Sequence, residues 1–244
     1  SSSLNDIHPS VCKTKAGESV YVFTNLGNCY KVDAENVPDG KWREKGTALK
    51  ELVKDLSKQE KPVFIHSFGE DMGKGNIIFF TKDGLVKKSP LKDYAVAKSS
   101  FQAIKLKDGD EVISVEFEKK NVTMLFITEN GMSLNADMSD VPVQGRISGG
   151  VKGINLNSDD CCIFASQVED VGEQIVVTDK GFAKRVILAH LDVMARYRKG
   201  VKIIDLKGSN GTKLVFSSYV AEKKINMSKD LLVNTKDPID VISY

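Results

Sequence analysis

Short apolar runs that end in the same turn signal recur along the chain. Each consists of three or four apolar residues followed by Thr-x-x-Gly, and the threonines are Thr24, Thr81, Thr128 and Thr178. The runs are rich in Val, Ile and Phe, which favours β-strands. The glycine supplies the positive φ angle that a hairpin turn needs. Each copy therefore predicts two antiparallel strands joined by a tight turn.

The spacing of these copies indicates a repeat. The threonines are 57, 47 and 50 residues apart, and a degenerate fifth copy at 214–220 begins 39 residues after the fourth. Between copies, a glycine or small-residue turn leads into an alternating strand, and one further strand follows. Four strands in each repeat of this length are typical of propeller blades. We therefore predict an all-β fold of about five four-stranded blades over residues 16–244, preceded by a tail or linker at 1–15.

A blade buries both faces only by stacking on its neighbours, so large apolar side chains on the strands are expected in the core. The phenylalanines that fit this description are Phe23, Phe80, Phe126 and Phe164. Trp42 is also expected in the core, although Lys41 and Arg43 flank it in a loop.

The charge is distributed unevenly along the chain. The net charge is +2, yet residues 180–229 hold twelve Lys and Arg against three Asp and Glu, a local charge of +9. This asymmetry suggests a polyanionic partner, and on charge alone a solvated lysine-rich surface is an equal alternative. The apolar runs are too short to span a bilayer, and the polar N-terminus lacks a secretory signal. We expect a cytoplasmic protein with no membrane partner.

The residue types that carry catalysis or bind metals are scattered. The four cysteines form no Cys-x-x-Cys pair and are expected to be free thiols, and the three histidines lack the spacing of a triad. A propeller glycosidase would need carboxylates at the same end of several strands, whereas the repeated polar feature here is basic. We therefore expect neither a cofactor nor catalysis.

Three features together resemble a known family. They are the repeated Thr-x-x-Gly-x-x-Lys-Lys/Arg hairpin, the glycine-rich basic loop that follows it, and the alternating Ile-x-Leu strand. This combination resembles the C-terminal domain of bacterial type IIA topoisomerase A subunits, those of DNA gyrase and topoisomerase IV. The closest stretches are residues 81–91, 144–154 and 178–185, and the resemblance covers about residues 17–230.

The resemblance implies a β-pinwheel, a propeller-like ring whose blades exchange strands and whose rim binds and bends double-stranded DNA for strand passage. The catalytic tyrosine, the metal ligands and the ATP site of such enzymes lie in other domains, so it implies a non-catalytic part of an ATP-dependent enzyme. The implied partners, met at the nucleoid, are DNA and the ATPase B subunit, together with the rest of the A subunit.

One motif departs from the gyrase pattern. Gyrase A subunits carry a Gln-Arg-Arg-Gly-Gly-Lys-Gly box in the loop of their first blade. Here the corresponding loop reads Lys-Trp-Arg-Glu-Lys-Gly at 41–46, and a partial match to the box lies in the third repeat, at 144–153. This departure favours a topoisomerase IV-like or diverged gyrase subunit.

Basic residues that recur on the hairpin arms and in the loops after them are the candidate DNA contacts. Such contacts to phosphate are independent of sequence and release counterions, and nearby glycines let the main chain approach the duplex. The hairpin arms contribute Lys87, Lys88, Lys184, Arg185, Lys223 and Lys224; the loops contribute Lys41, Arg43, Lys45, Gln144, Arg146, Lys152, Arg196, Arg198, Lys199 and Lys202. The alternative is a protein-interaction propeller without DNA binding of its own, whose binding would depend little on salt.

Overall fold

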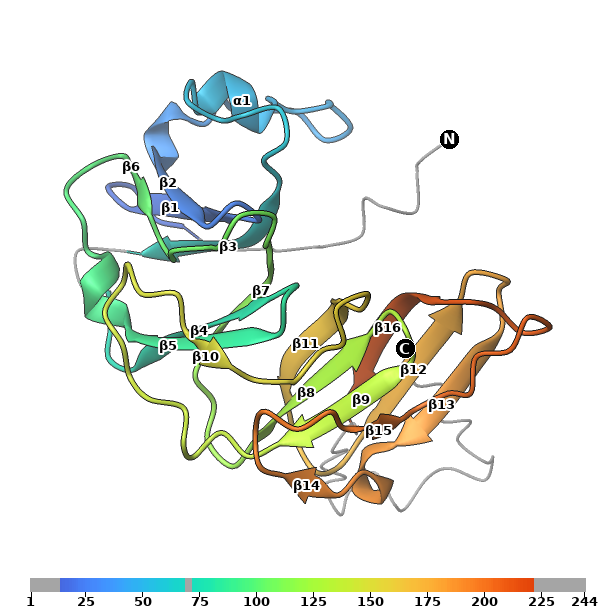
Figure 1. Cartoon of the computed structure of the whole chain (residues 1–244). Helices are drawn as coiled ribbons and strands as arrows, with labels where there is room; N and C mark the ends of the chain where they lie inside the picture. The colour runs from blue at the N-terminus through green and yellow to red at the C-terminus, as the bar shows by residue number, and fades with distance from the viewer. Residues whose placement is uncertain (1–13, 69–71, 222–244) are drawn as a thin grey trace, which may run out of the picture.

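The computed structural model of the chain describes residues 14–68 and 72–221, which fold into four sheets that follow one another in chain order (Figure 1). The first sheet has the order β3-β1-β2-β6, with β1 (Ser19–Thr24), β2 (Asn28–Asp33), β3 (Pro62–Phe68) and β6 (Ser100–Gln102). The second has the order β10-β5-β4-β7, with β4 (Asn76–Thr81), β5 (Leu85–Pro90), β7 (Val112–Phe117) and β10 (Val151–Lys152).

The third sheet places β11 (Cys162–Val168), β8 (Thr123–Thr128) and β9 (Met132–Ala136) side by side, and β14 (Val193–Met194) and β15 (Val201–Lys202) both pair with β9. The fourth has the order β13-β12-β16, with β12 (Glu173–Thr178), β13 (Ala183–Ile187) and β16 (Leu214–Val220). One short helix, α1 (Leu49–Leu52), and the 3-10 turns η2 (Ala34–Asn36), η3 (Leu91–Tyr94) and η4 (Leu188–His190) complete the described part. The predicted all-β class is confirmed.

Each intact Thr-x-x-Gly copy forms the turn of a hairpin, as predicted. The threonine hydroxyl explains part of the motif, because it accepts a hydrogen bond from the amide four residues later: Leu85 bonds to Thr81 at 3.2 Å and Met132 bonds to Thr128 at 3.1 Å. The turn glycines have positive φ angles, as at Gly84 with +77°. The side chain and the glycine thus close the same turn from its two ends.

Only the first arm of the degenerate fifth copy lies within the described residues. It is β16, which pairs along β12 and closes the fourth sheet. The described residues therefore form four sheets, and the prediction that 214–220 begins a fifth blade is wrong, because this strand belongs to the fourth sheet. The second arm predicted for the fifth copy lies outside the described residues.

Strands are exchanged between successive repeats. β6 follows the second hairpin but pairs with β2 of the first, β10 follows the third hairpin but pairs with β5, and β15 follows the fourth hairpin but pairs with β9. This is the strand exchange that the pinwheel resemblance implies. In the fourth sheet, no strand within residues 14–68 and 72–221 occupies the equivalent place beside β13.

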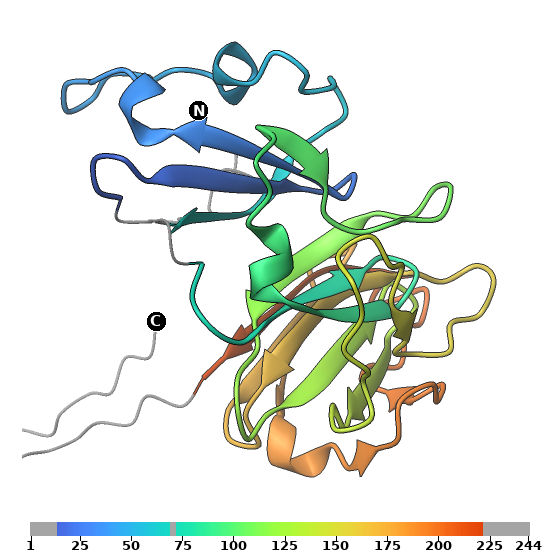
Figure 2. The ribbon, with the colours of Figure 1, turned by 90° about the vertical axis from the view of Figure 1, so that its left-hand side faces the viewer.

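The core lies between the sheets, which stack face to face along the chain (Figure 2). In β4, Ile77 and Phe79 belong to the cluster shared with the first sheet, whereas Ile78 and Phe80 pack towards the third. Because both faces of this blade are covered, its central strand β4 reads as an unbroken apolar run. At the inner edge, β3 contacts β7, β7 contacts β11 and β11 contacts β16.

Three of the four predicted core phenylalanines, Phe23, Phe80 and Phe126, are fully buried, and Phe164 is half-buried. Trp42 contradicts its prediction, because it is 93% exposed in the loop between η2 and α1. No strand of a neighbouring sheet stacks on this loop in the described part of the chain.

The outer faces of the first and fourth sheets, at the two ends of the stack, differ in how far they are covered. The outer face of the first sheet is covered, because Tyr30 and Val32 pack against Val53 and the apolar residues of α1. The fourth sheet exposes apolar side chains instead, with Ile187 and Phe216 each about half exposed.

Candidate nucleic-acid interface

Two loops come together at the outer edges of the sheets, and the second of them is strongly basic. We name residues 137–150, which precede β10, the third-repeat loop, and residues 195–200, which precede β15, the fourth-repeat loop (Figure 1). Each loop is hydrogen-bonded to the segment that the preceding repeat contributes to the sheet before it. The amide of Lys105 donates to the Ser148 carbonyl at 3.1 Å, and the amide of Tyr197 donates to the Gly153 carbonyl at 2.5 Å. Because of strand exchange, each of these loops is therefore held by hydrogen bonds to the repeat before it.

Between these loops lies a basic hollow of about 370 Å³. Among the described residues, its charged lining consists of Lys105, Lys107, Lys152 and Arg196, without an acidic side chain. The Lys152 ammonium donates to the Tyr197 hydroxyl at 2.9 Å and lies 4.6 Å from the centre of that ring. Converging cations raise the local concentration of a polyanion, so this surface suits phosphate groups. We name Lys105, Lys107, Arg146, Lys152 and Arg196 the basic row.

The predicted loop residues lie along or beside this row. Arg146 is half-buried; its guanidinium donates to the Gln102 carbonyl and lies 5.2 Å from the centre of the Phe101 ring. Arg196 forms an ion pair with Asp140 at 3.0 Å and donates to the Lys152 carbonyl at 3.1 Å. Both arginines thus hold neighbouring segments in place as well as adding charge to the surface.

The remaining loop residues vary in exposure. Gln144 is half-buried, and its amide donates to the Lys88 carbonyl at 2.8 Å. Arg198, Lys199 and Lys202 are exposed beside the hollow, and Lys202 lies 3.6 Å from Asp205. These exposed cations extend the basic row towards the fourth sheet.

The hairpin-arm pairs do not form a line of exposed charges. Successive residues on a strand point to opposite faces, so the side chains of Lys87 and Lys88 lie on opposite faces of β5. Lys87 is only 1% exposed, and the structure corrects its assignment as a direct DNA contact. Lys88 is 11% exposed at its side chain and pairs with Glu118 at 2.9 Å. Both faces of this middle blade are covered, which is why a charged pair there is not a surface pair.

The pair in the fourth repeat is more open. Lys184 is exposed, and its ammonium donates to the Ile203 carbonyl at 2.9 Å. Arg185 is exposed and pairs with Glu173 at 3.1 Å. Lys223 and Lys224 lie outside the described residues.

The first-repeat candidates lie elsewhere on the molecule. Lys41, Arg43 and Lys45 are exposed in the loop between η2 and α1, where the amide of Lys41 donates to the Glu44 carboxylate. No hydrogen bond or ion pair found among the described residues joins them to the basic row.

Sequence reasoning missed two members of the basic row, Lys105 and Lys107. They flank Leu106 in the alternating segment after β6 and were not singled out because no basic pair or box marks them. Strand exchange could have revealed them, because it places the segment after β6, which belongs to the second repeat, next to the third-repeat loop. A search for basic residues in that segment would then have placed both lysines at the interface.

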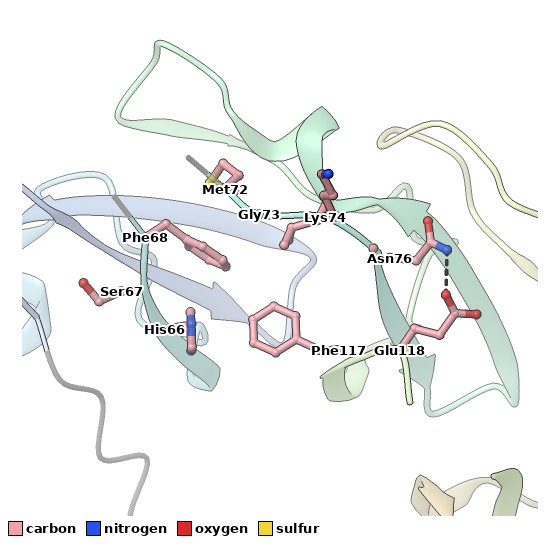
Figure 3. A pocket seen from close by; sticks show the side chains of 11 residues that line it. His66, Ser67, Phe68, Met72, Gly73, Lys74, Asn76, Phe117 and Glu118 are labelled. Carbon is pink, nitrogen blue, oxygen red and sulfur yellow. Dashed lines mark hydrogen bonds between the residues drawn. The ribbon is translucent and has the colours of Figure 1, made fainter. Parts of the chain in front are cut away.

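A second hollow, of about 360 Å³, lies between the first two sheets (Figure 3). His66, Phe68 and Phe117 form its aromatic wall, and the Asn76 amide donates to the Glu118 carboxylate at 2.6 Å. It lacks the converging cations of the basic row, since the charged side chains that line it among the described residues are Lys74 and Glu118.

Within residues 14–68 and 72–221, no three His, Cys, Asp or Glu side chains gather in a metal-binding group. No helix in that part is long and apolar enough to cross a bilayer. Cys29, Cys161 and Cys162 are free thiols, as predicted, and Cys12 lies outside the described residues.

A family model now identifies the fold. The model described as the DNA gyrase C-terminal domain, β-propeller, matches residues 18–59, 75–117, 123–169 and 175–210, each match containing one hairpin. The chain belongs to this family. The resemblance inferred from the hairpins and loops is confirmed, and the chain is the C-terminal domain of a type IIA topoisomerase A subunit.

Similar proteins carry both names of that enzyme class. The A subunit of DNA topoisomerase 4 from Staphylococcus epidermidis is 27% identical over 207 residues, covering 84% of this chain and 26% of the relative. The A subunit of DNA gyrase from Metamycoplasma arthritidis is 24% identical over 275 residues, covering 90% and 31%. The crystal structure of the C-terminal domain of DNA topoisomerase IV has a TM-score of 0.79 at 25% identity, covering 84% of this chain and 64% of that one. The chain thus spans less than a third of the length of each of these two curated relatives.

Proposed function

We propose that this domain binds duplex DNA along the basic row and bends it, so that its parent topoisomerase receives the segment for strand passage. The observation that supports this is the hollow between successive loops. In the part of the chain that the structure describes, it is lined by Lys105, Lys107, Lys152 and Arg196 and by no acidic side chain. The domain's own part in this function is binding, with no bond made or broken.

Duplex DNA suits this surface better than single strands. Proteins that bind single strands stack bases on several aromatic side chains. Among the described residues, Tyr197 is the one aromatic side chain that lines the hollow, and it already bonds to Lys152. Phosphate contacts from lysine and arginine need no base exposure. Bending a duplex costs about 1–6 kcal/mol, which contacts along successive blades would offset.

The position of the box-like loop favours a topoisomerase IV-like or diverged gyrase parent. The match to the box lies in the third-repeat loop, whereas the loop at 41–46 has a different sequence. In the parent enzyme, which acts in the cytoplasm at the nucleoid, the partners of this domain are the ATPase B subunit plus the rest of the A subunit.

The test is the affinity of the chain for an end-labelled duplex at several salt concentrations, with the probe reporting the bend. Four neutralised phosphates give a slope of about −3.6 in log K against log salt. We expect that slope or a steeper one, together with a shorter end-to-end distance. No binding at low salt would overturn the proposal, and salt-insensitive binding of a protein partner would favour an interaction propeller instead.

A matched pair of variants locates the interface. R198Q/K199Q removes two exposed charges beside the hollow, and K50Q/K54Q removes two exposed charges around α1. We expect the first pair to weaken binding and to reduce the salt slope by about 0.9 for each phosphate that is no longer neutralised. The second pair should leave the slope unchanged. Equal reductions in both would mean that net charge, and not the basic row, governs binding.

A further inference from the structure

Lys87 lies buried beneath the third-repeat loop, where segments of the second and third repeats meet. Its ammonium donates to the Tyr94 hydroxyl at 2.8 Å, to the Ala103 carbonyl at 2.7 Å and to the Arg146 carbonyl. The side chain is 1% exposed, and none of these three acceptors is a carboxylate. A buried ammonium without a counter-ion is costly, so this position calls for an explanation beyond core packing.

We propose that Lys87 is a positioning residue, which holds the main chain of the third-repeat loop at Arg146 and thereby presents the basic row to DNA. The inference rests on the proposed function. It replaces the direct phosphate contact predicted for Lys87 with an indirect role.

The contacts of the loop support this assignment. Its two sides are attached to β5 and to the segment after β6, since Gln144 donates to the Lys88 carbonyl and Ser148 accepts from the Lys105 amide. Between these points, the carbonyl of Arg146 accepts from Lys87. The ammonium therefore holds the middle of the loop, at the residue whose guanidinium belongs to the basic row. A guanidinium has five N–H donors, so its bond to Gln102 leaves others for a phosphate.

Lys184 provides an internal comparison. It is three residues after Gly181, as Lys87 is three residues after Gly84, and both ammonium groups donate to a carbonyl on the segment inserted into the preceding sheet. Lys184 is nevertheless exposed, with no hydrogen bond from its ammonium to a loop among the described residues. The bond to a loop thus distinguishes Lys87 from its counterpart.

The charge of Lys87 is also sensitive to pH in the neutral range. Burial and, to a smaller extent, the Arg146 charge lower the pKa of Lys87 to about 7, while Asp93 acts in the opposite direction. The other titratable groups near this site are Tyr94 on η3 and Cys29 on β2, and burial raises the pKa of each. Both therefore stay neutral where Lys87 titrates.

The experiment compares the full chain with its K87M and K184M variants by amide hydrogen exchange of residues 144–148 and of Lys105. K87M removes the bond in the middle of the loop, so we expect faster exchange there, whereas K184M should leave this exchange unchanged. Unchanged exchange in a folded K87M would overturn the proposal. If K87M does not fold, Y94F keeps the charge and removes one of its acceptors; it should give a smaller acceleration, and none would count against the proposal.

Duplex affinity provides the second readout. We expect K87M to bind about tenfold more weakly at pH 6, the effect of losing one charge-assisted hydrogen bond. Wild-type affinity should fall more than that of K87M between pH 6 and 8.5, because only the wild type loses the charge of Lys87. Parallel pH profiles would overturn the proposal. A wild type that does not bind DNA would refute the proposed function, while the exchange measurement would still test the bond to the loop.

Discussion

Strand exchange predicts that alanine substitutions at two equivalent turn glycines will differ in cost. Gly84 and Gly181 close the second and fourth hairpins with nearly equal φ angles, +77° and +81°. A Cβ atom at Gly84 would lie 2.6 Å from the Cγ2 atom of Ile154, which the third repeat inserts over the turn. A Cβ atom at Gly181 would meet nothing within 4 Å. The two positions thus differ in the covering segment and hardly in backbone conformation.

The magnitudes follow from that difference. Alanine in the left-handed region costs about 1–2 kcal/mol at either site, and the stiffer unfolded chain offsets about 0.4–1 kcal/mol of this. Overpacking adds about 1–3 kcal/mol at Gly84 alone. We therefore expect G181A to lose about 1 kcal/mol of unfolding free energy and G84A about 2–4 kcal/mol.

Urea denaturation followed by far-UV circular dichroism measures both losses, provided that the slopes stay equal to that of the wild type. Gly131, whose added Cβ would lie 3.1 Å from Ile204, should fall between the two. Equal losses for G84A and G181A would refute the reasoning, because they would mean that the segment around Ile154 does not press on the turn.

Other predictions concern single side chains. Burial pushes the pKa of Glu60 upward, but hydrogen bonds from Thr24, Asn28 and Tyr30 outweigh it and hold the pKa below 4.5; the stability this carboxylate adds is therefore present above pH 4.5 and lost as the pH falls below it. Acid titration of wild type and E60Q should show a steeper loss for the wild type, with E60Q about 1–3 kcal/mol less stable at pH 7. The pKa of Lys87 is about 7 in the folded chain against an ordinary 10.5, so the unfolded chain binds more protons between these values and stability rises with pH there. Urea midpoints should show this rise in the wild type and lack it in K87M. Trp42 is the only tryptophan, so a change of its fluorescence on addition of duplex would show that the loop at 41–46 contacts DNA, and an unchanged spectrum would place that loop outside the interface.

Local sequence was sufficient for the hairpins and insufficient for the environment of their lysines. A hairpin needs only an apolar run, a hydroxyl and a turn glycine, all within ten residues. The burial of Lys87 depends on the third-repeat loop, whose Arg146 lies about sixty residues further along the chain. Lys184 has the same local setting and stays exposed. A basic pair is therefore a weak indicator of a surface contact when both faces of a blade are covered.

The exposure of Trp42 has a related explanation. Its aromatic character predicts burial, but burial requires a neighbouring element to stack on the segment, and sequence alone does not show where the stack ends. The first sheet is covered by α1, with Tyr30, Val32 and Val53 in the contact, and Trp42 lies outside that cluster.

Strand exchange also affects how such a domain can change in length during evolution. The unit that a gene would duplicate runs from one hairpin to the next, whereas the folded unit takes its outer strand from the repeat that follows. An extra copy inserted within the array would receive a strand from its successor and give one to its predecessor. It would therefore add no unpaired sheet edge. The number of blades, and with it the length of any DNA path along them, can thus change in whole steps. Loss of a terminal repeat has a different consequence, because it leaves the preceding sheet with an open edge to which another chain can pair.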